Sequence, residues 1–136
     1  MLERFLILAL AALLFALIMG GWRRWQTVRL RRLQTRDLPS PLTALLDGTR
    51  PTLLYFTADH CVQCKLQQTP ILEQLRQLID VPVHTIDAVS ADELTQYFGV
   101  MTVPTTVVLD GQRRATAVNH GLAPLPKLQA QLASAA

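Results

Sequence analysis

Hydrophobic and polar positions divide the chain into two parts of different character. Residues 5–22 form an apolar run without a charged side chain, whereas beyond residue 51 short apolar runs alternate with segments whose apolar residues recur every three or four positions. The first pattern is typical of a helix in a lipid bilayer, and the second of strands and helices that share a core. The sequence therefore predicts an apolar N-terminal helix followed by one folded domain.

The pattern after residue 41 predicts helices that alternate with strands. Strands are predicted over four runs with strand-like composition: 51–56, 83–86, 105–109 and a stretch ending near Val118. Helices are predicted over four segments with helical character: 41–46, 61–79, 91–98 and 125–132. Asp110-Gly111 is a hairpin signal, so the last two strands should pair antiparallel. The order β-α-β-α-β-β-α predicts an α/β fold, with a mixed sheet and helices on both faces.

Local signals predict how three of these helices begin or bend. Ser40 is a candidate N-cap for the first helix, and Ser90 with Glu93 fits a capping box for the third. Pro70 lies inside the second helix and should bend or break it. The apolar face of that second helix is predicted to carry Leu66, Ile71, Leu72, Leu75, Leu78 and Ile79.

The apolar run at residues 5–22 has the length of a membrane span. As a helix it covers roughly 27 Å, against a hydrocarbon core of about 30 Å. Trp22 and Trp25 follow where aromatic residues meet the membrane interface. A cleaved signal peptide is the alternative, but the preceding residues are barely basic and 18–21 lack a good small-x-small cleavage site. We therefore expect a transmembrane anchor at 1–22, a basic juxtamembrane linker at 23–41 and a folded domain at 42–136.

The charge distribution changes the interpretation of the overall net charge of +3. Six arginines and no acidic residue lie between residues 23 and 36, whereas the part from Leu38 onward is slightly acidic. This local positive charge argues against nucleic-acid binding and indicates a membrane surface. The positive-inside rule then predicts a single-pass protein of the cell membrane whose C-terminal domain is cytoplasmic. Residues 22–36 either extend the helix or lie along anionic headgroups; a solvated spacer that only sets topology is the alternative.

The two cysteines, Cys61 and Cys64, carry the strongest chemical signal. They follow a predicted strand and open a predicted helix, where unpaired N–H groups and the helix dipole stabilise a thiolate. The spacing places Cys64 one turn beyond Cys61, close enough to form a disulfide. We expect Cys61 to attack a substrate disulfide and Cys64 to resolve the mixed disulfide.

Two alternatives and one neighbouring residue bear on this interpretation. A zinc site would require two further Cys or His ligands with paired spacing, and an inert pair of core cysteines is the second alternative. We expect no metal and no cofactor. His60, if protonated, would stabilise the Cys61 thiolate; alternatively, it is a solvent-facing loop residue.

Three separated stretches resemble the thioredoxin family. Residues 56–65 (FTADHCVQCK) are similar to its active-site stretch, 97–105 (YFGVMTVPT) to its second signature, and Gly121 with the helix after it to its C-terminal end. The resemblance covers about residues 51–132 and implies a thioredoxin-like fold with thiol–disulfide oxidoreductase activity. It also implies a cis Val103–Pro104 peptide that faces the cysteines, with the Val103 backbone pairing with the substrate chain.

The sequence departs from the family pattern at four places. His60 replaces a frequent tryptophan, Val62-Gln63 replaces a frequent Gly-Pro, and Pro70 falls one position later than expected. Tyr55 stands where many thioredoxins have a buried aspartate that assists proton transfer to the second cysteine. We expect Tyr55 to be a core residue.

These observations predict a membrane-tethered oxidoreductase that reduces or exchanges protein disulfides. Its expected partners are protein thiols and disulfides, an unidentified electron donor or acceptor, and the lipid bilayer. One alternative is an oxidoreductase at the exported face, acting in disulfide exchange or cytochrome c maturation. Another is a non-catalytic thioredoxin-like module that binds a partner at the membrane, although such a scaffold has no need of the two thiols.

Overall fold

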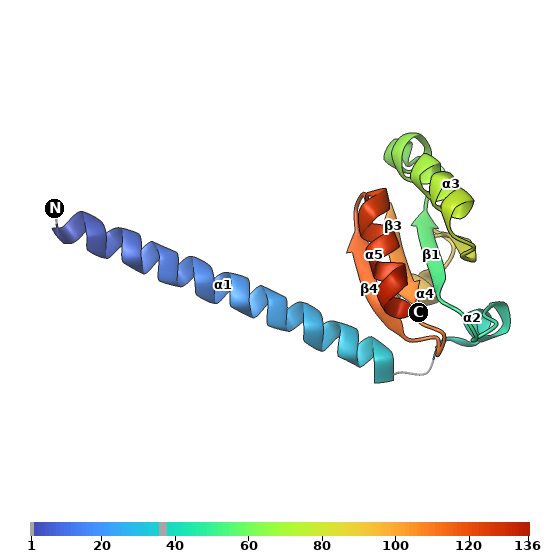
Figure 1. Ribbon diagram of the computed structural model, residues 1–136, viewed down its shortest axis with the longest axis horizontal. Helices are drawn as coiled ribbons and strands as arrows, with labels where there is room; N and C mark the ends of the chain where they lie inside the picture. Colours follow the sequence, from blue (N-terminus) through green and yellow to red (C-terminus); the bar gives the residue numbers. More distant parts are fainter. Residues whose placement is uncertain (1, 36–37) are drawn as a thin grey trace. The chain divides into compact units, whose positions relative to one another are not determined.

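The computed structural model describes residues 2–35 and 38–136, which divide into two compact units (Figure 1). The first unit ends at Arg32 and the second is Leu33–Ala136. Arg36, the last arginine of the predicted basic linker, lies outside the described residues.

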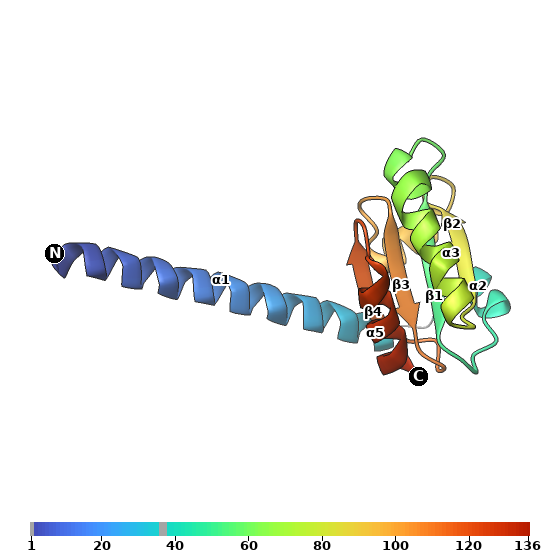
Figure 2. The same cartoon turned by 45° about the horizontal axis from the view of Figure 1, so that its top comes forward.

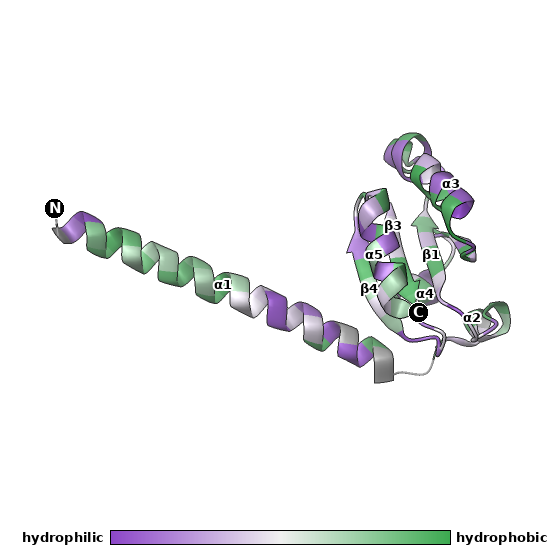
Figure 3. Cartoon of the chain, viewed as in Figure 1, coloured by the Kyte–Doolittle hydropathy of each residue, from purple (hydrophilic) through white to green (hydrophobic). Residues whose placement is uncertain are grey.

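Helix α1 runs from Leu2 to Thr35, and its residues up to Arg32 belong to the first unit. Its side chains are exposed from Glu3 to Val28, and hydropathy changes along its length from apolar to strongly polar (Figure 3). Among the described residues, α1 is the one helix long and apolar enough to cross a membrane, a property that a signal sequence shares. Of the conformations expected for residues 22–36, the structure has a continuous helix up to Thr35.

The second unit contains a four-stranded sheet in the order β2-β1-β3-β4 (Figure 2). The strands are β1 (Thr52–Thr57), β2 (Val83–Asp87), β3 (Thr105–Leu109) and β4 (Ala115–His120). The helices are α2 (Ser40–Leu45), the π-helix η1 (Cys64–Gln68), α3 (Thr69–Leu78), α4 (Asp92–Phe98) and α5 (Leu125–Ala135). Strand β1 is parallel to β2 and antiparallel to β3, and β4 is antiparallel to β3, so the predicted mixed sheet is confirmed.

Two hydrophobic clusters cover the two faces of the sheet. Leu53 and Tyr55 of β1 belong to a cluster with residues of α3 and α5, whereas Leu54 and Phe56 belong to a cluster with residues of α2 and α4. Successive strand residues point to opposite faces, so β1 is buried on both. Its apolar run without polar interruption is the sequence signature of this central position, and helices on both faces are confirmed.

Strand register brings three loops to one end of the sheet. Phe56 at the end of β1 pairs with Thr105 at the start of β3, and Thr105 pairs with His120 at the end of β4. The segments after β1, before β3 and after β4 therefore meet at this end. These segments contain the two cysteines, the Val103-Pro104 dipeptide and Gly121.

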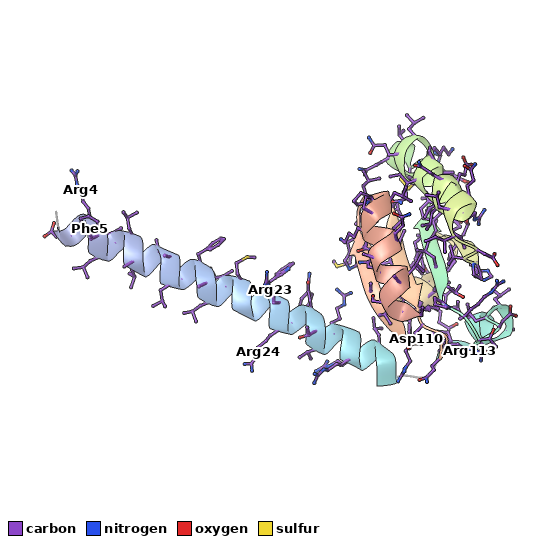
Figure 4. The ribbon with its side chains drawn as sticks, in the orientation of Figure 1. Arg4, Phe5, Arg23, Arg24, Asp110 and Arg113 are labelled. Carbon is purple, nitrogen blue, oxygen red and sulfur yellow. A yellow bond between two sulfur atoms is a disulfide. The ribbon has the colours of Figure 1, made fainter. Side chains whose placement is uncertain are left out.

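The hairpin between β3 and β4 turns at Asp110, as predicted. The backbone N–H groups of Gln112 and Arg114 both donate to Asp110 Oδ1 at 2.8 Å. Arg113 adopts a left-handed φ of 63° between them, and Figure 4 shows Asp110 and Arg113 at this turn. The side chain of Asp110 thus satisfies the donors that the tight reversal exposes.

Both predicted serine caps are wrong. Helix α2 begins at Ser40 itself, because the carbonyl of Pro39 accepts the first helical hydrogen bond from Leu42 at 2.9 Å. Helix α4 begins at Asp92 with Ala91 as its N-cap, and Ser90 Oγ donates to Asp87 Oδ2 at 2.9 Å. Ser90 therefore bonds to the carboxylate at the end of β2, and α4 has no side-chain cap.

The predicted helix over 61–79 divides into η1 and α3, with Pro70 in the first turn of α3. Helical residues run without a gap from Val62 to Leu78, so the chain does not break at Pro70, and the expected bend stays a prediction. Leu66 is 72% exposed and Leu78 is 59% exposed, against prediction. Leu66 is two residues from both buried Cys64 and buried Gln68, and therefore lies on the opposite, solvent-facing side of this turn. Leu78 is the last residue of α3 and is exposed to solvent.

Leu33 provides a test of how the second unit begins. It is buried in the cluster that includes Leu42 and Phe98, and its carbonyl accepts a hydrogen bond from Tyr97 Oη at 3.2 Å. In a fragment that starts at Arg23, Leu33→Ala should lower the free energy of unfolding by about 2 kcal/mol in urea titrations. The exposed Val28→Ala should change it by less than about 0.5 kcal/mol. Equal effects of the two substitutions would contradict the packing of Leu33.

Candidate active site

The two cysteines lie where β1 gives way to a helix. Strand β1 ends at Thr57, and a tight turn brings the N–H of Cys61 to the carbonyl of Ala58 at 3.0 Å. Helical structure begins at Val62, and Cys61 and Cys64 are joined by a disulfide with their Cα atoms 5.2 Å apart. The expected strand–CxxC–helix arrangement and the disulfide pairing are both present.

The two sulfur-bearing residues differ in their surroundings. Cys64 is completely buried and belongs to the core cluster between the sheet and helices α3 and α5, whereas Cys61 is partly exposed at its edge. The backbone N–H of Cys64 donates to Cys61 Sγ at 3.1 Å. A donor at a helix N-terminus favours negative charge on the atom it faces. The geometry therefore distinguishes a solvent-accessible Cys61, with a donor to its sulfur, from an enclosed Cys64.

The segment before β3 approaches the same cluster. The Val103–Pro104 bond is cis, as the family resemblance implied. Pro104 is buried, and partly buried Val103 packs against the cluster that contains Cys64, as Cys61 does. Thr105 Oγ1 donates to the carbonyl of Thr102 at 2.7 Å and ties this segment to the start of β3. The structure thus brings Val103 and Pro104 to the cysteine end of the sheet, and their role toward a substrate stays a prediction.

Tyr55 is a core residue, as expected, but its hydroxyl group has a role that sequence reasoning missed. Tyr55 Oη donates to the carbonyl of Cys64 at 3.2 Å and lies 3.3 Å from Thr69 Oγ1. The position that is often a buried carboxylate in the family therefore holds a neutral hydrogen-bond donor to the backbone of the second cysteine. The buried location of an aromatic residue with a polar tip is the signal that such a partner exists.

The π-helix explains the late position of Pro70. The N–H of Thr69 bonds to the carbonyl of Cys64, five residues earlier, instead of the four of an α-helix. The turn accommodates one additional residue between Cys64 and the proline. Pro70 lies in the first turn of α3, directly after the π-helical turn. π-helical turns of this kind occur often at functional sites.

The three histidines lie in three different segments of the second unit. His60 is exposed on the turn directly before Cys61, His84 lies in β2, and His120 ends β4. Within residues 2–35 and 38–136, no three His, Cys, Asp or Glu side chains are grouped to hold a metal ion. The expected influence of His60 on the Cys61 thiolate stays a prediction.

Gln68 is a second residue that sequence reasoning missed. It ends the π-helix and is completely buried, with its side-chain amide bonded to the backbone of Ala123. Its spacing of four residues from both Cys64 and Leu72 places it on the buried side of the helix, a signal that the sequence analysis did not use. The late position of Pro70 was the one available signal that this turn is unusual.

Comparisons with known proteins agree on one family. The family model described as Thioredoxin matches residues 42–134. A thioredoxin of Alicyclobacillus acidocaldarius subsp. acidocaldarius is 31% identical over 90 residues, covering 65% of this chain and 84% of that protein. A point mutant of thioredoxin from Halobacterium salinarum superposes with a TM-score of 0.63 at 25% identity, covering 73% of this chain and 86% of that one.

A second solved structure extends this similarity. Oxidised thioredoxin O2 of Arabidopsis thaliana superposes with a TM-score of 0.57 at 26% identity, covering 70% of this chain and 83% of that one. The family match covers the described strands and the disulfide-bonded pair of cysteines. The chain therefore belongs to the thioredoxin family, and it is a thiol–disulfide oxidoreductase for protein thiols and disulfides.

Proposed function

We propose that the protein is tethered to a membrane by α1 and reduces or exchanges protein disulfides at the cytoplasmic face, with Cys61 as nucleophile and Cys64 as resolving thiol. The proposal rests on the difference in exposure between Cys61 and Cys64. Cys61 is accessible and has a backbone donor to its sulfur at 3.1 Å, whereas Cys64 is buried. A bulky protein substrate can reach only the first of these sulfurs directly.

The reaction begins with the reduced pair. The Cys61 thiolate attacks one sulfur of a substrate disulfide, forms a mixed disulfide and expels the other substrate sulfur as a thiolate, which takes up a proton. Cys64 then loses its proton and attacks Cys61 Sγ. This step releases the second substrate sulfur and forms the Cys61–Cys64 disulfide. Two electrons have passed to the substrate, and an electron donor restores the dithiol; the reverse sequence oxidises a substrate dithiol.

Two segments near the cysteines complete the proposed site. The backbone of Val103, presented beside Pro104, pairs with an extended substrate chain as an additional strand does at a sheet edge. His60, when protonated, adds positive charge next to Cys61 and stabilises its thiolate. Both roles fit the cysteine end of the sheet, where the loops before β3 and after β1 meet.

The tether combines an apolar segment with an aromatic and basic one. After the apolar run, Trp22 and Trp25 lie with ring centroids 5.7 Å apart, and the Arg29 guanidinium lies 5.4 Å from the Trp25 ring centre. Arg23 and Arg24 project from α1 directly after the apolar run (Figure 4). Tryptophan favours the membrane interface, and arginine favours anionic headgroups on the cytoplasmic leaflet.

The first prediction from the proposed function concerns the order of attack by the two cysteines. Cys64→Ser should accumulate mixed disulfides with protein substrates, because Cys61 still attacks but the resolving thiol is absent. Cys61→Ser should accumulate few, because the remaining thiol is buried. Non-reducing gels of affinity-purified protein measure both. Equal trapping by the two variants would refute the assignment.

The second prediction concerns topology. Because both native cysteines lie in the folded domain, labelling of the reduced protein by a membrane-impermeant maleimide reports where that domain is. The native cysteines should react only after the cells are permeabilised. A Glu3→Cys variant that also carries Cys61→Ser and Cys64→Ser should react in intact cells. The reciprocal result would support an exported-face oxidoreductase, and loss of the first twenty-two residues from the mature chain would indicate a signal peptide.

The third prediction concerns Tyr55. Tyr55→Phe removes the hydroxyl that donates to Cys64 and contacts Thr69, while keeping the aromatic ring in the core. The free energy of unfolding should fall by about 1–2 kcal/mol, since each hydrogen bond contributes about 1 kcal/mol. Chemical denaturation of the oxidised protein measures this. Tyr97→Phe, which removes the bond to Leu33, is a control away from the cysteines.

A further inference from the structure

Gln68 is a polar side chain enclosed in an apolar core. No part of it is exposed, and both ends of its amide are bonded to one residue of a distant loop. Gln68 Nε2 donates to the carbonyl of Ala123 at 3.2 Å, and the N–H of Ala123 donates to Gln68 Oε1 at 2.8 Å. Both polar groups of this buried amide therefore have hydrogen-bond partners, and the two bonds fix the orientation of the side chain.

Gln68 lies on the buried side of the helical stretch that carries Cys64. The turn begins at Cys64 and ends at Gln68, and the buried positions along this helical stretch are Cys64, Gln68, Leu72 and Leu75. Gln68 therefore lies on the same inward side as the second cysteine, one turn later. The side chain that contacts Ala123 belongs to the turn that carries the resolving thiol.

The loop that Gln68 holds lies at the cysteine end of the sheet. It consists of Gly121, Leu122 and Ala123, between the end of β4 and α5. The N–H of Gly121 donates to the carbonyl of Pro104 at 2.8 Å, and Ala123 is bonded to Gln68. Leu122, between these two attachments, is 39% exposed. The loop is thus bonded to the cis-proline segment at one end and to the cysteine-bearing helix at the other.

We propose that Gln68 is a positioning residue, which holds the loop 121–123 beside the Cys61–Cys64 pair in the conformation that protein substrates bind. This inference rests on the proposed reduction or exchange of protein disulfides. Gln68 is buried and does not touch a substrate. It acts by satisfying the two backbone groups of Ala123, which otherwise reach hydrogen-bond partners only if the loop moves toward water. A small disulfide, which needs only Cys61, does not depend on the loop.

The test compares Gln68→Met with Gln67→Met in the full chain in detergent micelles. Methionine has nearly the length of glutamine but makes neither hydrogen bond. Gln68→Met should raise KM for reduction of insulin disulfides about tenfold, with kcat within about twofold. Turnover of a small aromatic disulfide should be unchanged, and hydrogen exchange of the Ala123 amide should accelerate at least about tenfold. Gln67→Met, an exposed neighbour in the same turn, should match the unmodified protein.

A rescue experiment separates positioning from general packing. Protonated Gln68→Glu has both the acceptor and the donor that Ala123 requires, whereas the carboxylate lacks the donor and repels the Ala123 carbonyl. We therefore expect the ratio of insulin activity to small-disulfide activity of the Gln68→Glu variant to rise as the pH is lowered from about 8 to about 5. The unmodified protein should show no such recovery in the same ratio.

The possible outcomes are distinct. An equal loss of insulin and small-disulfide turnover in Gln68→Met, or unchanged KM with fast exchange at Ala123, would overturn the proposal. If Gln68→Met is unfolded by circular dichroism, the pH series of Gln68→Glu decides, and no recovery at low pH would overturn it. Failure of the unmodified protein to reduce insulin would instead refute the proposed function, because exchange at Ala123 is measured independently.

Discussion

The pairing of β1 with strands on both sides is the constraint on which the rest of the structure depends. As a central strand buried on both faces, β1 satisfies its backbone groups with β2 and β3 while its side chains join two separate clusters. A shift of its register by one residue would exchange the two faces and expose apolar side chains. The same register determines that the end of β1 lies beside the start of β3, and thus that Cys61 and Val103 reach the same cluster.

One additional residue between Cys64 and Pro70 accounts for much of what is particular to this site. The insertion is accommodated as a π-turn, whose longer hydrogen bond leads from Thr69 to Cys64. Within this turn Leu66 is exposed and Gln68 is buried, and Tyr55 donates a further hydrogen bond to the same Cys64 carbonyl. The backbone of the second cysteine is therefore held by two donors. A neutral tyrosine supplies one of them from the position where many relatives have a carboxylate.

Periodicity predicted the sheet, the helices and the position of the cysteines, because burial of one face leaves a repeating mark on the sequence. Strand β3 was predicted at Thr105–Leu109, as observed, since its boundaries coincide with a proline and a turn. The serine caps were predicted wrongly because a local motif shows neither the exact residue at which a helix begins nor which neighbouring group a hydroxyl bonds. The partners of Tyr55 and Gln68 were beyond prediction, since they join residues nine and fifty-five positions apart with no periodic signal.

Side-chain amides, and not apolar contacts alone, specify how the C-terminal segment docks. Gln68 bonds to Ala123 just before α5, and within that helix Gln131 exchanges two hydrogen bonds with Asn119 of β4, at 2.8 and 3.0 Å. Asn119 also donates to Thr106 Oγ1 of β3 at 3.1 Å. Apolar burial is non-directional, so Leu128 and Leu132 alone would permit α5 to slide along the sheet. Two amide attachments, one before the helix and one near its end, remove that freedom, because a displaced helix would leave buried polar groups without partners. These contacts on both sides of the loop 121–123 therefore fix its conformation beside the cysteines.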